Sequence, residues 1–434
     1  MAFKKVLGFW DLFWLGIGGM VGVAILTFPS VTYQQAGPSS IISWIAAGIF
    51  SLLMALIYAE MVTAFPRSGA LVTFPYEAFG RGKLARYLAF LEGIGYYLGT
   101  LFGIVISAII IGNYMGPAFS TGTVGSFAIA EISLIVVGAI NLLGARITSR
   151  ANLVMSIFFI SLFALVIILA LMHGSFAGLS PFISGSGIPG IVYAIPIAIL
   201  AYGSWTALIT IPEEATEVKK IPKAIIYSII VVTVLYALMV LVTYMNLNAN
   251  QLANTYYYYP VLGLVTLLGN PSLAFLFDIA AVLSMVAVML VMVLSNARIA
   301  YALSKLRFAP SSLGILSRNS IPVYATIASF AIPMVLSAFP SYYYQYVIIG
   351  AIIGTGLPRV IDLASYLRLR KARAYKPSFR VRYGIVVALA AAIGLIVSEL
   401  SLALSDVLWS VAAFILLTLL FLAIERRRSS AKPE

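Results

Sequence analysis

The sequence has 434 residues, of which 62% are hydrophobic and only 9% charged, and its formal net charge is +13. A water-facing surface needs about 25–35% charged residues, so this composition excludes an ordinary soluble protein. Cysteine is absent and His173 is the only histidine, so disulfides, cysteine nucleophiles and the usual zinc or haem ligands are not expected. We therefore predict no cofactor and no resident metal.

Apolar runs broken at polar and Gly/Pro-rich joints predict about twelve membrane-spanning helices, because a helix of ~20 apolar residues crosses the bilayer. A strand barrel is excluded, since its apolar residues would alternate. The predicted spans are 11–33, 40–65, 87–116, 127–144, 151–172, 188–212, 224–245, 272–304, 321–338, 342–367, 383–403 and 405–424, with a tight turn near Leu404.

Lys and Arg residues fall in alternate joints. They precede the first span and follow each even-numbered one, whereas the intervening joints, such as 34–39 and 173–187, contain none. If the basic residues were placed at random, about half of them would lie in these intervening joints. Both termini are therefore predicted to be cytoplasmic, and the protein is predicted to be a multi-pass protein of the cytoplasmic membrane. The bilayer is thus a predicted partner. Nucleic acid is not, because the charge is divided among short loops without a contiguous basic face.

The first span carries the run GIGGMVGVAIL, with Gly16, Gly18, Gly19 and Gly22 near mid-membrane. Glycine weakens a helix, and a backbone group freed in hydrocarbon costs several kcal/mol unless a cavity or ligand satisfies it. A half-helix beginning near Val23 would direct its N–H groups at an anion, and the preceding half would direct carbonyls at a cation. The run predicts a site for a zwitterion. Glycines used only for helix packing remain an alternative, and a dinucleotide fingerprint lacks its preceding strand.

The sixth span is also interrupted, by Pro196, Gly203 and Pro212. Two interrupted spans five positions apart predict inverted repeats with a site at their interface near the bilayer midplane, although no residue-level repeat is visible. The predicted units are the first repeat, the second repeat, the last two spans and a cytoplasmic tail, at 1–173, 188–369, 383–424 and 425–434.

Four segments together resemble the amino acid-polyamine-organocation superfamily of secondary transporters. MVGVAILTFP at 20–29 is similar to its glycine-rich first-helix motif, and YAEMVTAFPRSGALVTFPYEAFGR at 58–81 to its second-helix exit. AYGSW with PEEATEVKKIPKAI, within 201–225, resembles its broken sixth helix and the segment after it. NARIAYALSKLRFAP at 296–310 resembles its eighth-helix exit. The order of these segments along the chain is that of the family.

The resemblance implies an all-α membrane fold with a leucine-transporter-like 5+5 inverted repeat and broken helices one and six. It also implies that backbone N–H groups receive a substrate carboxylate, that carbonyls on both breaks accept its ammonium group, and that Trp205 closes over it. The family commonly has glycine where Ala24 stands. The substrate-binding residues so implied are Gly18, Gly19, Gly22, Val23, Ala24, Ala201, Tyr202, Gly203, Ser204 and Trp205.

The coupling ion is left open between H⁺, Na⁺ and exchange without an ion. Some proton-coupled members of the family carry a lysine in the fifth helix, but the span 151–172 is uncharged, so that group does not act here. A sodium site could use carbonyls near Gly18 and Val21 with the Ser284 hydroxyl. Asp278 is a candidate for proton carriage or for an outer gate, because an ionisable residue within a span is rarely without function.

Four further charged residues are gate candidates. Glu60 and Glu92, near the cytoplasmic ends of their spans, are predicted to be solvated or to form gate salt bridges, with proton carriage as the alternative. Arg359 and Asp362 are three residues apart on one helix, and the prediction is a structural pair or an arginine that extends to the membrane interface, with a gate role as the alternative. Glu214 belongs to an acidic segment that is predicted to form a cytoplasmic gate or a solvated face.

These patterns predict a secondary active transporter of amino acids that works by alternating access and is not an enzyme. Neutral substrates are favoured, because the lining includes Ile17, Met20 and Trp205 and no nearby charge. A cationic amino acid or polyamine carrier or exchanger is the alternative if Asp278 or Glu92 reaches the cavity. A membrane-embedded enzyme would need paired catalytic groups that no span supplies, and a channel would need continuous polar helices. No feature of the sequence indicates an oligomeric state.

Overall fold

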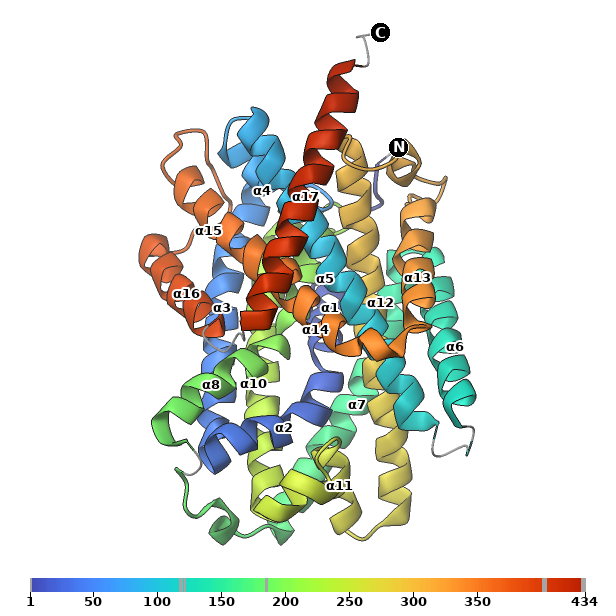
Figure 1. Ribbon diagram of the computed structural model, residues 1–434, viewed down its shortest axis with the longest axis vertical. Helices are drawn as coiled ribbons and strands as arrows, with labels where there is room; N and C mark the ends of the chain where they lie inside the picture. The colour runs from blue at the N-terminus through green and yellow to red at the C-terminus, as the bar shows by residue number, and fades with distance from the viewer. Residues whose placement is uncertain (1, 117–119, 121, 184–185, 400–403, 431–434) are drawn as a thin grey trace.

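The computed structural model describes residues 2–116, 120, 122–183, 186–399 and 404–430, and they form an all-helical bundle (Figure 1). The α-helices are α1 (Phe9–Met20), α2 (Val23–Ala36), α3 (Ser40–Ala64), α4 (Ala70–Ala78), α5 (Lys83–Met115), α6 (Gly122–Leu142), α7 (Ala145–His173), α8 (Gly187–Leu200), α9 (Ala207–Thr210), α10 (Ile221–Asn246), α11 (Pro260–Leu267), α12 (Pro271–Lys305), α13 (Val323–Ser337), α14 (Tyr343–Ala351), α15 (Leu357–Leu369), α16 (Gly384–Glu399) and α17 (Leu404–Ser430). Short turns include the 3-10 helix η4 (Gly203–Thr206) and the π-helical turn η9 (Ile352–Gly356).

Seven of the described helices are long and apolar enough to cross a membrane, or eight when α8 and the following η4–α9 segment count as one bent span. The predicted class, a multi-pass α-helical membrane protein, is therefore confirmed. The count of about twelve spans and the inverted repeat stay predictions. The turn predicted near Leu404 adjoins residues 400–403, which lie outside the described part of the chain.

Helix α1 occupies the middle of the bundle, where it packs against α7, α10 and α12. Helices α6 and α13 lie together on one flank and α16 and α8 on the other (Figure 1). A short helix at the centre, with longer helices around it, buries its backbone away from lipid, and only there can irregular backbone persist at membrane depth. The bundle thus places the end of α1 in its most enclosed part.

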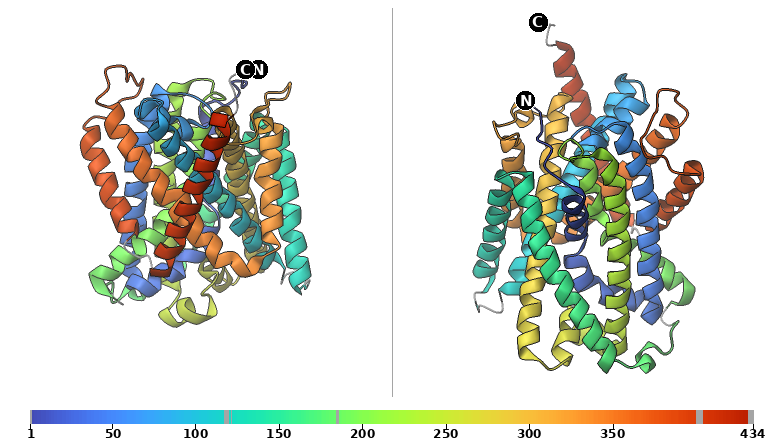
Figure 2. Two further views of the ribbon diagram at one scale, coloured as in Figure 1. Left: turned by 45° about the horizontal axis from the view of Figure 1, so that its top comes forward. Right: turned by 180° about the vertical axis from the view of Figure 1, so that it is seen from behind.

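The N-terminal segment and the end of α17 lie at the same end of the molecule (Figure 2). The basic loops around α4 and after α15 gather at that end as well. This arrangement has both termini on one side, as the alternation of basic joints predicts. That this side is the cytoplasmic one stays a prediction.

Candidate substrate site at two interrupted helices

The first predicted break is present between α1 and α2. Val21 has an extended backbone, with φ −80° and ψ 106°, and α2 begins at Val23 with Gly22 as its N-cap. A Cβ atom added to Gly22 would lie only 2.6 Å from the Val288 Cγ2 atom of α12. Gly22 is therefore required by close approach to α12, since no side chain fits between the two segments.

The second predicted break is present after α8. Helix α8 ends at Leu200, Ala201 and Tyr202 form a turn, and the chain continues as η4 and α9 at an angle of 45° to α8. Pro196 lies inside α8, one turn before the break, where it removes a backbone donor. The prediction that the sixth span is interrupted is confirmed.

The two breaks meet in space. A Cβ on Gly19 would lie 3.3 Å from the Ser204 Cβ, so α1 and η4 touch with no gap for a larger residue. The Tyr236 hydroxyl of α10 donates to the Met20 carbonyl oxygen at 2.7 Å and lies 3.2 Å from the carbonyl oxygen of Ala201. One buried hydroxyl thus joins the two breaks, with its single proton directed chiefly to the nearer Met20 carbonyl. Sequence reasoning missed Tyr236, whose only signal is a polar hydroxyl within an uncharged span.

Replacing Tyr236 by phenylalanine should lower uptake several-fold and destabilise the protein by about 1–3 kcal/mol, because the buried donor that joins the two breaks would be lost. Tyr227→Phe is the matched control, since that ring lies on the same helix but is half exposed. The measurements are substrate uptake in liposomes and thermal unfolding in detergent. Equal behaviour of the two variants would show that Tyr236 does not hold the breaks together.

The N-terminus of α2 has no side-chain cap. Gly22 offers no side chain to cap it, and Val23 and Ala24 are partly exposed although Val21 before them is fully buried. A Cβ at Gly203 would meet no atom within 4 Å, so open space lies beside η4. Uncapped N–H groups at a helix start attract an anion.

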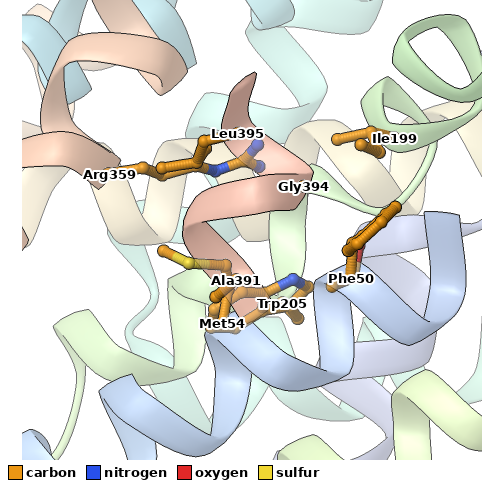
Figure 3. Close-up of a pocket in the computed structure, with 9 residues that line it drawn as sticks. Phe50, Met54, Ile199, Trp205, Arg359, Ala391, Gly394 and Leu395 are labelled. Carbon is orange, nitrogen blue, oxygen red and sulfur yellow. The ribbon is translucent and has the colours of Figure 1, made fainter. Parts of the chain in front are cut away.

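Trp205 belongs to η4 and packs against α3. It is buried, its ring packs edge-on against Tyr58 with centroids 5.4 Å apart, and its indole nitrogen has no hydrogen-bond partner among the described residues. Trp205, Met54 and Arg359 help line a cavity of about 10 Å³ (Figure 3). That volume holds about one water molecule, so entry of an amino acid beside Trp205 requires the surrounding helices to move.

The candidates for a sodium site lie on different sides of the first break. A Cβ on Gly18 would lie 2.5 Å from the Asn152 and Ser156 side chains of α7, so Gly18 faces away from η4. The Ser284 hydroxyl donates to the Ala281 carbonyl oxygen of its own helix at 2.7 Å. The Ser284 backbone oxygen lies 3.7 Å from a Cβ placed on Gly22, so the Ser284 backbone, and not its hydroxyl, lies beside the break that contains Val21. A sodium site at these positions stays a prediction.

Glu60 is a buried anchor, which excludes the solvated alternative. Its carboxylate accepts hydrogen bonds from the Tyr366 hydroxyl at 3.0 Å and from the Val381 backbone N–H at 2.8 Å, and it forms a salt bridge of 3.1 Å with Arg370. The sequence places Glu60 near a helix end, but the segment after α15 folds back over it. The salt-bridge alternative is confirmed, with Arg370 as the partner, and a role in gating stays a prediction.

The predicted pairing of Arg359 with Asp362 is wrong. No salt bridge joins them among the described residues, and both Asp362 carboxylate oxygens are buried without a hydrogen-bond partner. Residues three apart on a helix are separated by about 60° around its axis, so neighbours can turn to different partners. Arg359 extends toward Leu395 of α16 (Figure 3). Glu92 is likewise buried and has no hydrogen-bond or salt-bridge partner among the described residues, so neither predicted role, solvation or a gate salt bridge, is seen there.

Asp278 lies toward the end of the molecule opposite the termini. Its carboxylate accepts a hydrogen bond of 2.6 Å from the Tyr114 hydroxyl of α5, and Tyr259 packs edge-on against Tyr114. Asp278 therefore holds α5 and α12 together there. Its predicted use in proton carriage or gating stays a prediction.

A buried ion pair lies at the end of the molecule that carries the termini. Arg298 of α12 contacts Glu214 with N–O distances of 2.7 and 3.1 Å, and both side chains are buried. The backbone N–H groups of Val6 and Leu7 donate to the Glu214 carbonyl oxygen. Glu214 is thus not part of a solvated face. Sequence reasoning missed Arg298 as its partner, because the two residues are 84 positions apart.

An all-helical membrane bundle whose two interrupted helices meet at its centre has the architecture of a carrier. The amino acid permease family model matches residues 7–424, and the chain belongs to this family, within the amino acid-polyamine-organocation superfamily. The resemblance seen in the sequence is therefore confirmed, and the family consists of transporters and not of enzymes.

The chain is similar to proteins with different named substrates. It is 29% identical to a branched-chain amino acid permease of Bacillus subtilis, over 75% of this chain and 72% of that protein. It is 24% identical to the vacuolar cationic amino acid transporter 8 of Arabidopsis thaliana, over 78% and 59% of the two chains. An aspartate-proton symporter of Bacillus subtilis is 29% identical over 55% of this chain and 47% of that protein. Amino acid transport is common to them, and their substrate classes differ.

Proposed function

We propose that this protein is a secondary active transporter that moves neutral amino acids across the cytoplasmic membrane by alternating access. The observation that carries the proposal is the meeting of the two breaks, where the uncapped start of α2 lies close to the carbonyls of Met20 and Ala201. An N–H cluster and a carbonyl cluster at one point complement the carboxylate and ammonium groups of an amino acid.

The predicted binding residues divide by role. N–H groups of Gly22, Val23 and Ala24 receive the carboxylate, and carbonyls near Gly19 and on the Ala201–Gly203 turn receive the ammonium group. The substrate must compete with the Tyr236 hydroxyl, which occupies two of the carbonyls in this conformation. Binding therefore rearranges contacts between α1, η4 and α10.

A neutral side chain is favoured by the surroundings. Ile17, Met20 and Tyr202 are buried at the breaks, and none of the described salt bridges involves a residue of α1, α2 or η4. A charged side chain would lose hydration there without a partner. The branched-chain permease among its relatives supports this choice. A cationic amino acid or polyamine is the second candidate, because Glu92 is a buried carboxylate with no hydrogen-bond partner in the described part of the chain.

The small size of the cavity beside Trp205 supports alternating access. The cavity beside Trp205 has room for about one water, and the Glu214–Arg298 pair closes the end that carries the termini. Transport then requires that pair to separate so that α1 and α9 can move away from α12. A gradient of H⁺ or Na⁺ supplies the driving force in this proposal.

The proposal is tested with purified protein in liposomes offered labelled neutral, cationic and acidic amino acids under imposed H⁺ or Na⁺ gradients. We expect saturable uptake of neutral amino acids that unlabelled substrate suppresses. Uptake of cationic amino acids or polyamines alone would favour the second candidate. Absence of any uptake or exchange by correctly folded protein would overturn the proposal.

A further inference from the structure

Two carboxylates lie buried without hydrogen-bond partners inside the bundle. Glu92 is on α5 and Asp362 is on α15, two helices that pack against each other. Both side chains are fully buried, and none of their four carboxylate oxygens has a hydrogen-bond donor among the described residues. Such groups inside a membrane protein are costly and rarely structural, because removing charge from water must be compensated.

Glu92 and Asp362 each lie one helical turn from a point where α5 and α15 touch, since a Cβ on Gly95 would lie 3.4 Å from the Pro358 Cγ atom. The two carboxylates are close enough to affect each other electrostatically, and both also affect the Tyr58 hydroxyl of α3 electrostatically. Ionised carboxylates have lone pairs but no hydrogen, so two of them cannot form a hydrogen bond. A single proton on one carboxylate supplies the missing donor and removes one of the two buried charges. Shared protons are the usual solution when two acids meet in a low-dielectric site.

None of the neighbouring titratable or charged groups named below supplies the two carboxylates with a hydrogen bond or a salt bridge in the described part of the chain. Tyr58 of α3 and Tyr96 of α5 are neutral neighbours, and Arg359 acts on Tyr96 without forming a salt bridge with either acid among the described residues. The carboxylate of α4, Glu77, is paired with Arg67 and Arg81. Residues 384–397 of α16 carry no titratable side chain. Two carboxylates, one guanidinium and one proton sum to zero charge.

We propose that Glu92 and Asp362 together form a proton-binding site that couples transport to a pH gradient. The inference rests on the proposed transport function and deepens it by naming the ion and its ligands. The only covalent change is proton transfer: water delivers a proton to one carboxylate oxygen, the new O–H group donates to the other carboxylate, and release returns the proton to water. No oxidant or further reactant takes part.

The structure also links this acid pair to the substrate site. The Tyr58 hydroxyl lies near the acid pair without a hydrogen bond to it, and the Tyr58 ring packs against Trp205 at 5.4 Å between centroids. Trp205 in turn belongs to the segment that follows the second break. Tyr58 therefore connects the proton site to η4, the segment that is proposed to move during transport. Loss of the proton would leave two like charges between α5 and α15, favouring a conformation that hydrates them.

The test compares Glu92→Gln and Asp362→Asn with wild-type protein in liposomes. Glu131→Gln is the matched control, because that half-buried carboxylate bonds to Ser337 on the outer flank, away from the breaks. Two transport readouts are needed: uptake driven by a pH gradient, and counterflow of labelled against unlabelled amino acid without a gradient. A third readout, the infrared band of a protonated carboxyl group, is independent of transport.

We expect the wild type and Glu131→Gln to accumulate substrate under an inward proton gradient. Glu92→Gln and Asp362→Asn should lose that accumulation at least tenfold, keep counterflow, and lack the pH-sensitive infrared band. Accumulation by both variants equal to wild type, or wild-type uptake that responds only to a sodium gradient, would overturn the proton site. Failure of counterflow in the wild type would instead overturn the transport function itself.

Discussion

Replacing Arg298 by methionine is expected to destabilise the protein by about 3–5 kcal/mol, because the substitution leaves the Glu214 carboxylate buried without its partner. The pair also anchors the N-terminal segment, since Val6 and Leu7 bond to the Glu214 backbone and the Arg298 guanidinium lies over the Phe3 ring. The change should appear as a lower thermal unfolding temperature in detergent, with an N-terminal segment more accessible to protease.

Two further variants distinguish the effect of losing the ion pair from the effect of losing side-chain packing. Arg298→Met combined with Glu214→Leu should recover most of the lost stability, because both charges are removed and the volume is kept. Arg81→Met breaks an exposed pair with Glu77 and should change the unfolding temperature little, since surface pairs contribute little. An Arg298→Met protein as stable as wild type would show that this ion pair does not hold the end of the bundle closed.

Replacing Gly22 by alanine is expected to reduce uptake at least tenfold, which corresponds to about 1.4 kcal/mol of lost binding or transition-state stabilisation. The added Cβ would lie 2.6 Å from the Val288 Cγ2 atom, so α2 would have to shift away from α12 and its first N–H groups would move with it. The backbone at Gly22 is extended, with φ −163°, so the effect is steric and not conformational.

A second substitution that removes the clashing atom tests whether the effect is steric. Gly22→Ala combined with Val288→Ala should recover part of the uptake, because the second change removes the atom in contact. Gly82→Ala is the control: a Cβ there meets nothing within 4 Å, and uptake should remain at the wild-type level. Normal uptake by Gly22→Ala alone would mean that the start of α2 does not position the substrate.

The two helix breaks were predictable from the sequence because glycine and proline weaken helices locally. The runs around Gly22 and Pro196 signal an interruption whatever the rest of the chain does. The alternation of basic joints is likewise found by counting Lys and Arg residues loop by loop, and it predicts that the termini lie on the same side. What a residue does to its own backbone can be read from its neighbours in sequence.

The partners across the bundle were not predictable in this way. Tyr236 contacts Met20 from 216 positions away, and Arg298 contacts Glu214 from 84 positions away. Asp362 was assigned to Arg359 because spacing along one helix is visible in a sequence, whereas its approach to Glu92 depends on how α5 packs against α15. Side-chain pairs between spans require the tertiary arrangement.

The central claim is that an amino acid binds between the two breaks and is released to alternate sides. Because the chain has no cysteine, Ser204→Cys in the wild-type background introduces a single thiol beside Gly19. We predict that a membrane-impermeant thiol reagent modifies this thiol from either side of sealed vesicles, and that the transported amino acid protects it. A thiol that reacts from one side only, or equally fast with and without every amino acid tested, would contradict the account.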